Sequence, residues 1–178
     1  MSALAADSQQ QFVEAWGAMG ALWGINRSVA RCHALLMASE DPLSLDEIAE
    51  RLQISRGNAS MSLKELRNFG VIRQVQNPGD RRDFYVTEPD VWTMFFRIFK
   101  ERKRREFDPA ARAVRALLEG APAPGKVRER LEQVGDLLDT METAASRLLA
   151  DPGATRAALA LLSGASIPFL RPSKKPPR

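Results

Sequence analysis

The fold is decided by residues 44–86, which read SLDEIAERLQISRGNASMSLKELRNFGVIRQVQNPGDRRDFYV. Ser44 and Glu47 form a capping box, in which each side chain can accept a hydrogen bond from the other residue's free backbone N–H group. Apolar residues then recur at helical spacing, and after a short break Ser55 is a second candidate N-cap. The next helix ends before Gly70, a residue type that readily takes the left-handed conformation after a helix. Two short helices joined by a tight turn predict a helix-turn-helix.

The sequence after the second helix changes to a periodicity of two residues, which indicates strands. Residues 71–75 and 84–86 read as two paired strands around the turn NPGDRR at 77–82. Arg81 and Arg82 lie at the tip of this hairpin. A basic hairpin directly after a helix-turn-helix predicts a winged helix-turn-helix, with residues 71–86 as the wing.

The outward face of the second helix is polar, small and almost free of acidic residues. Small side chains let a helix approach the major groove closely, and Ser, Asn and Lys can reach base edges and phosphates. The arginines of the wing are suited to the minor groove or the phosphates. We therefore predict that a recognition helix at about 55–69 and the wing contact DNA through nine residues: Ser55 (also the cap), Arg56, Asn58, Ser60, Met61, Lys64, Asn77, Arg81 and Arg82.

These residues also carry a family resemblance. The run SRGNASMSLKELRNFGVIRQVQNPGDRRDFY resembles the GbsR branch of the MarR-type transcriptional regulators, most specifically at Ser55–Asn58 and at PGDRR, residues 78–82. The similarity begins near Trp23 and continues to about Phe107, and beyond Asp108 only the helical character is similar. The resemblance implies dimerisation through the terminal helices, a double-stranded DNA operator, and a link to osmoprotectant metabolism and choline sensing.

Helical segments flank the motif on both sides, so the expected fold is mainly α: a winged helix-turn-helix with a two-stranded β wing and additional N- and C-terminal dimerisation helices. The amphipathic N-terminal helix carries an aromatic stripe from Phe12 to Trp23, but its glycines weaken it, so it should depend on packing. A long apolar stripe runs along residues 127–148. The expected helices lie at about 12–23, 26–39, 88–106, 108–119, 127–150 and 152–162.

Four parts of the chain follow from this pattern. They are an N-terminal helix (1–25), the winged helix-turn-helix DNA-binding domain with the following long helix (26–107), a C-terminal helical extension (108–170), and a disordered basic tail (171–178). The run RIFKERKRRE at 97–106 is strongly basic and has two interpretations. It is either a solvated helix face with pairs such as Glu101–Arg105, which we favour, or a flank for the DNA backbone.

Composition excludes several classes of protein. The chain has 178 residues, a formal net charge of +4, one Cys and one His. These numbers allow no internal disulfide framework and no zinc cluster, and Cys32 and His33 are adjacent, so they diverge on a helix and cannot act as a nucleophile–base pair. We find no phosphate loop, paired-carboxylate motif, signal peptide or membrane segment, and we expect a cytoplasmic, nucleoid-associated protein that is not an enzyme and needs no cofactor.

Three functions remain open at this point. The first is a dimeric DNA-binding regulator, most simply a repressor, that reads an inverted repeat. The second is a winged helix that binds protein and has no specific DNA site; such a module should expose apolar or mixed-charge residues on the outward face. The third is a ligand sensor, in which a choline-like cation binds among Trp92, Phe96, Trp16 and Trp23 by cation–π attraction, an idea that comes from the family. A plain aromatic core is the favoured reading of these rings.

Overall fold

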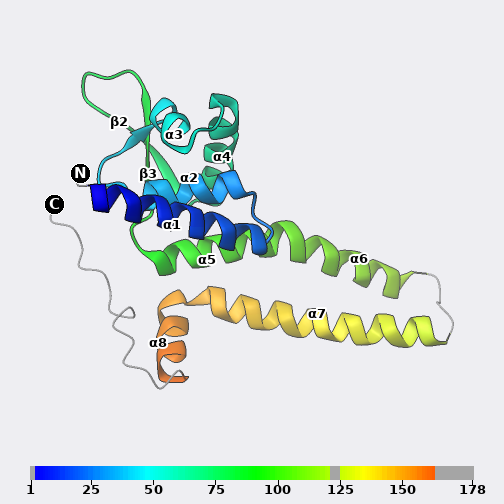
Figure 1. Cartoon of the computed structure of the whole chain (residues 1–178). Coiled ribbons are helices and arrows are strands. Elements are labelled where there is room, and N and C mark those ends of the chain that lie inside the picture. Colours follow the sequence, from blue (N-terminus) through cyan, green and yellow to red (C-terminus); the bar gives the residue numbers. More distant parts are fainter. Residues whose placement is uncertain (1–2, 121–124, 163–178) are drawn as a thin grey trace. The chain divides into compact units, whose positions relative to one another are not determined.

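A computed structural model describes residues 3–120 and 125–162, and Figure 1 shows a mainly helical chain with one small antiparallel sheet. The chain forms two compact units, Met1–Met94 and Phe95–Arg178. The division falls inside one helix, whereas the sequence-based domains divide after residue 107, and those domain assignments stay predictions. The predicted tail at 171–178 lies outside the described residues.

The first unit contains the winged helix-turn-helix, which confirms the predicted fold. Its elements are α1 (Ala3–Leu22), α2 (Arg27–Met37), β1 (Leu43–Ser44), α3 (Leu45–Leu52), α4 (Arg56–Asn68), β2 (Ile72–Gln76) and β3 (Asp83–Thr87).

Both predicted helix caps are formed. The Ser44 backbone N–H donates to the Glu47 carboxylate at 2.7 Å, and the Glu47 N–H donates to Ser44 Oγ at 3.4 Å. The Ser44 hydroxyl also donates to the Glu47 carboxylate at 2.6 Å, and this bond together with the one from the Ser44 backbone N–H lowers the pKa of the Glu47 carboxyl. The Asn58 N–H donates to Ser55 Oγ at 3.2 Å, and Gly70 has the left-handed φ of 70° that ends α4. The boundaries of the two helices therefore follow from local hydrogen bonding.

The sheet has a third strand that the sequence did not reveal. The strand order is β1–β3–β2, and Leu43 and Ser44 of β1 pair with Tyr85 and Phe84. A strand of two residues is too short to show a periodicity of two, and Ser44 was already explained as a cap. The added strand ties β3 of the wing to the start of α3.

Helix α2 supplies the centre of the first core, and α1 lies along it (Figure 1). Val13 of α1 is 1% exposed. A Cβ atom added to Gly20 would lie 2.6 Å from Ala30 Cβ, so the glycine is needed for the close approach of the two helices. The aromatic stripe is less buried than its helical spacing predicted. Helix α1 ends at Leu22, and Trp23 in the following turn is 56% exposed.

A single continuous helix follows the wing, which corrects the expected break before Pro109. Its segments are α5 (Val91–Arg102), the π-helical turn η1 (Lys103–Phe107) and α6 (Asp108–Glu119). The Asp108 N–H donates to the carbonyl of Lys103, five residues earlier. Pro109 has no N–H group, and its ring crowds an ordinary α-helical turn. The wider π turn accommodates both effects, so the helix continues through the proline.

At least four of the six basic residues at 97–106 form ion pairs, three of them with carboxylates of the same run, and these include the predicted pair Glu101–Arg105. Glu101 pairs with Arg104 and Arg105, each at 2.6 Å, and Arg102 pairs with Glu106 at 2.9 Å. The hydrogen bond from Arg104 is the main cause that lowers the pKa of Glu101 to about 2. Such exposed pairs add little stability, but they leave less free charge for DNA.

The second unit is built on the antiparallel pair of α6 and α7 (Lys126–Ala150), followed by α8 (Pro152–Leu162) (Figure 1). A Cβ atom on Gly135 of α7 would lie 2.9 Å from Leu118 Cδ1, which shows how closely α7 approaches α6. Among the described residues, no helix is both long and apolar enough to cross a bilayer.

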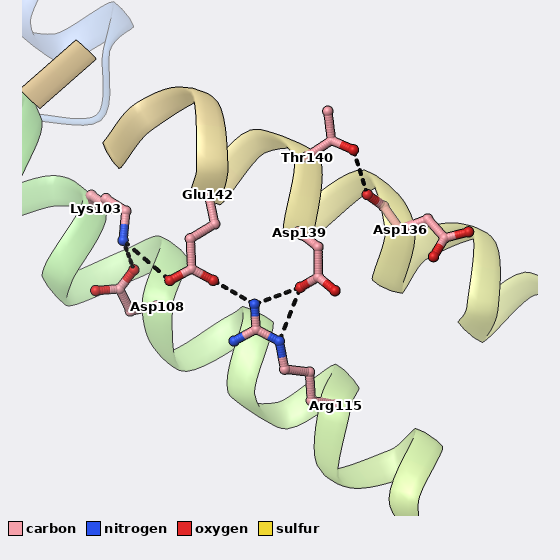
Figure 2. A network of polar contacts seen from close by, with 7 residues as sticks. All are labelled: Lys103, Asp108, Arg115, Asp136, Asp139, Thr140 and Glu142. Carbon is pink, nitrogen blue, oxygen red and sulfur yellow. Dashed lines mark hydrogen bonds and ion pairs between the residues drawn. The ribbon is translucent and has the colours of Figure 1, made fainter. Parts of the chain in front are cut away.

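Polar contacts also fasten α7 to α6 and η1, as Figure 2 shows. Arg115 contacts Asp139 at 2.5 Å and also Glu142. Lys103 Nζ lies 2.6 Å from Asp108 and 3.6 Å from Glu142. The hydrogen bond from Arg115 is the main cause that lowers the pKa of Glu142. This network fixes which face of α7 is directed toward α6.

Candidate nucleic-acid interface

The candidate interface begins with the outward face of α4. Helix α4 packs on α2 and α3, and its inner face is formed by Ala59, Ser62, Leu63 and Leu66, all buried. The opposite side is exposed, with these predicted contact residues on it: Arg56, Asn58, Ser60, Met61 and Lys64. The face that sequence periodicity directed outward is therefore open in the folded chain.

Two of these residues already have partners within the protein. The Asn58 side-chain amide donates to Ser28 Oγ at 3.2 Å, and its oxygen accepts a hydrogen bond from Ser62 Oγ at 3.4 Å. Arg56 pairs with Asp46 of α3 at 3.1 Å. Asn58 thus joins the start of α4 to the start of α2, and a base contact from Asn58 would require these bonds to be exchanged. Its role in DNA reading stays a prediction.

The two arginines at the wing tip have different surroundings. The Arg82 guanidinium donates to the Asp80 carboxylate, at 2.7 Å from its Nη2 and 3.0 Å from its Nε. Its Cζ atom also lies 5.1 Å from the centroid of the Phe84 ring. The hydrogen bond from Arg82 lowers the pKa of the Asp80 carboxyl. Arg82 therefore organises the wing, while Arg81 is exposed at its tip.

The turn at the wing tip is built from local signals. The Asp80 N–H donates to the Asn77 carbonyl at 3.1 Å, and Gly79 has a φ of 83°. Asn77 therefore has a role in the turn through its backbone. The Asp80–Arg82 pair was missed by sequence analysis, although an Asp two residues before an Arg in a turn is a signal that could have revealed it.

The four candidate ligand residues are distributed over both units. The Trp16 ring lies 5.8 Å from the Phe12 ring and 6.1 Å, edge-on, from the His33 ring. Trp23 is mostly exposed and Trp92 is half-buried. Phe96 belongs to the second unit, is 7% exposed, and lies 5.6 Å from the Phe95 ring. A ligand site formed by these residues stays a proposal.

His33 is more deeply placed than its sequence context indicated. It is 2% exposed, and its Nε2 atom lies 3.3 Å from Thr87 Oγ1. The Thr87 hydroxyl donates to the Val71 carbonyl at 3.3 Å, so its single proton is used there and Nε2 of His33 must be the donor to Thr87. Burial lowers the pKa of His33 to about 4. This histidine is a neutral link between α2 and the root of the wing.

Cys32 is fully buried, and burial raises the pKa of its thiol to about 11, so it is not an activated nucleophile. Within residues 3–120 and 125–162, no group of three or more His, Cys, Asp or Glu side chains is arranged to hold a metal ion.

Comparison with known proteins agrees with this geometry. A model of the MarR family matches residues 23–83. The HTH-type transcriptional repressor GbsR of Bacillus subtilis is 33% identical over 85 residues, which cover 48% of this chain and 47% of GbsR. The match therefore spans about half the length of that relative.

Two further similarities extend over more of the chain. The HTH-type transcriptional regulator MmpR5 of Mycobacterium tuberculosis is 29% identical over 140 residues, 78% of this chain and 83% of the relative. A crystal structure of a transcriptional regulator, 29% identical, superposes with a TM-score of 0.63 over 80% of this chain and 96% of that one. Both named relatives are regulators and not enzymes, in agreement with the sequence-based prediction. The winged helix, the family model and these relatives show that residues 23–83 form a MarR-type winged helix-turn-helix and that the chain is similar to GbsR and other regulators of this type.

Proposed function

We propose that the protein is a transcriptional repressor that binds a specific double-stranded DNA operator. The observation that carries the proposal is the exposed outward face of α4, which presents small, polar and basic side chains and lies in the same unit as the arginine-tipped wing. A helix with such a face can enter a major groove, where each base pair presents a distinct pattern of groups. The printed name of GbsR, a transcriptional repressor, favours repression over activation.

The operator is expected to be an inverted repeat read by a homodimer. One chain carries one recognition helix, so it can read one half-site. Two-fold symmetry would then separate the half-sites by about 10 bp or a multiple of this distance. The exposed apolar side chains of α7, which include Met141, are the surface that we assign to the dimer.

The experiment that tests this function is the selection of bound fragments from a random pool of double-stranded DNA. We expect enrichment of an inverted repeat with the spacing of one or more helical turns. If no sequence is enriched while the protein remains folded, the repressor proposal is wrong, and the protein-binding winged helix is the better explanation. Repeating the selection with millimolar choline or glycine betaine tests the effector.

A choline-like cation is the effector that we propose, and the surroundings of Trp16 support it. The Phe12–Trp16 ring pair adjoins His33, whose lowered pKa keeps it neutral near pH 7, so no positive charge at His33 would repel a cation. Phe12 is 36% exposed, so its ring is accessible. Cation–π contacts to such rings contribute about 0.5–2 kcal/mol each. If choline changes neither the selected sequence nor the affinity, these rings are core only.

The wing and the recognition helix should respond differently to mutation. Arg81→Ala is expected to weaken binding to all sequences and to reduce the slope of log affinity against log salt by about 0.9, the value for one lost phosphate contact. Lys64→Ala should instead change the preferred sequence, because Lys64 faces the major groove. Binding measured by fluorescence anisotropy at four salt concentrations separates these outcomes. A salt slope that Arg81→Ala leaves unchanged would contradict our assignment of the wing.

A further inference from the structure

Two features of α4 have no explanation within the folded chain, and both lie on its outward face. Met61 is 75% exposed in the middle of the helix. Gly57 lies one turn earlier, and a Cβ atom added there would meet nothing within 4 Å. Its φ is not in the left-handed region, so the backbone does not require glycine either. Folding alone would favour a polar residue at position 61 and an alanine at position 57.

The two positions form one surface because they are four residues apart. Helical side chains lean toward the N-terminus, so the side chain of Met61 lies over the turn that contains Gly57. The absence of a side chain at Gly57 leaves an open notch in this face, one turn before Met61. Ser60 and Lys64 are exposed on the same helix and add polar groups to the face.

The major groove of DNA offers one apolar group to a recognition helix, the C5-methyl group of thymine. A methionine side chain is unbranched and polarisable, so it adapts to a small apolar partner. We infer that Met61 and the notch at Gly57 recognise the C5-methyl group of a thymine in each operator half-site. This inference rests on the proposed function and adds to it the residue that determines one base of the sequence.

The test replaces each thymine of the selected operator by deoxyuridine, which lacks only the methyl group. The affinity is measured by fluorescence anisotropy at constant salt. Replacement at one symmetric pair of thymine positions should weaken binding by about fourfold for one half-site and by about 15-fold when both half-sites are changed. Met61→Ala should bind the thymine and deoxyuridine operators equally, whereas Met61→Leu should still distinguish them. A double-mutant cycle gives the coupling between side chain and methyl group.

Two further variants control for unfolding and for general weakening. Arg81→Ala should weaken binding to both operators by the same factor and leave their ratio unchanged. Gly57→Ala should raise the midpoint temperature of unfolding, because alanine favours helix and the added Cβ atom has space, yet it should weaken binding to the thymine operator. Better folding with weaker binding cannot result from a destabilised helix.

The outcomes separate this inference from the function on which it rests. Selection of an operator in which no thymine is sensitive to deoxyuridine would overturn the role of Met61 while the repressor proposal stands. The same conclusion follows if Met61→Ala retains full sensitivity. Failure to select any DNA would refute the proposed function itself, before any methyl group is compared.

Discussion

Replacing Met141 by lysine is expected to convert the proposed dimer into a monomer and to weaken binding to a full operator by about 100-fold or more. A lysine buried unpaired in an apolar interface costs several kcal/mol, and about 3 kcal/mol corresponds to about two orders of magnitude in the dissociation constant. A monomer would then hold only one half-site. The expected effect is large because both half-sites depend on the same interface.

The surface behind this prediction is a seven-residue repeat along α7. Val127, Val134, Met141 and Leu148 recur at intervals of seven and are between 42% and 59% exposed. A repeat of seven keeps such residues on one side of a helix that packs against another helix. The side of α7 that faces α6 carries Gly135 and the contacts drawn in Figure 2, and it lies about 100° around the helix from the apolar repeat. The network thus leaves the apolar repeat on a different side of α7 from the one that packs on α6.

Light scattering at micromolar concentration measures the dimer, and circular dichroism verifies that the helices remain. Thr140→Lys is the matched control, since it introduces the same charge one residue earlier, at an exposed position about 100° around the helix from Met141. This control should remain dimeric and bind DNA normally. A wild-type monomer with full specific binding, or a Met141→Lys variant that stays dimeric, would show that α7 is not the interface.

The elements that sequence analysis located correctly are those with local causes. The ends of α3 and α4 were predicted because Ser44, Ser55 and Gly70 act on neighbouring backbone groups. The pair Glu101–Arg105 was predicted for the same reason, since the two residues are four positions apart on one helix. Local hydrogen bonds and helical spacing depend on residues that are close in the sequence, so they can be predicted from it.

The features that were missed depend on distant residues or on geometry with no pattern of its own. Asn58 contacts Ser28, 30 residues earlier, so its partner could not be deduced from spacing. Strand β1 exists only because β3 returns beside it. Continuation of the helix through Pro109 depends on a π turn, where the sequence indicated a break. Sequence analysis therefore did not reveal the contacts that hold the predicted interface in place.

Lowering the pH from 7.5 to 5.0 is expected to reduce the free energy of unfolding by about 2 kcal/mol through His33 alone. Burial lowers the pKa of His33 from 6.5 to about 4 in the folded protein. The folded state therefore binds fewer protons than the unfolded state between these values. Stability from the neutral ring is complete above pH 6.5 and is lost progressively as the pH falls toward 4.

The variant His33→Gln should remove this pH dependence while it retains a side chain that can donate to Thr87. Urea unfolding of both proteins at pH 7.5 and 5.0 gives their free energies of unfolding at each pH. The decrease between the two pH values should be smaller for His33→Gln than for the wild type. Carboxyl groups with lowered pKa, such as Glu47, also lose stability in acid, but mainly below their ordinary pKa of 4.5, outside this range. If His33→Gln is unfolded, His33→Leu gives the same comparison.

The His33 ring lies beside the root of the wing, so its protonation should affect the DNA-binding unit. Thr87 and Val71, joined by the hydrogen bond beside His33, are at the end of β3 and immediately before β2, so they form the root of the wing. A charged imidazolium cannot stay buried against Thr87 and the edge of Trp16 without a carboxylate partner. Acid should therefore loosen the wing root before it disrupts the α6–α7 pair. Amide hydrogen exchange in β2 and β3, corrected for intrinsic rates, should therefore be faster at pH 5.0 than at pH 7.5. This role of His33 would be contradicted if exchange were equally slow at both pH values and if the free energies of unfolding of wild type and His33→Gln changed in parallel with pH.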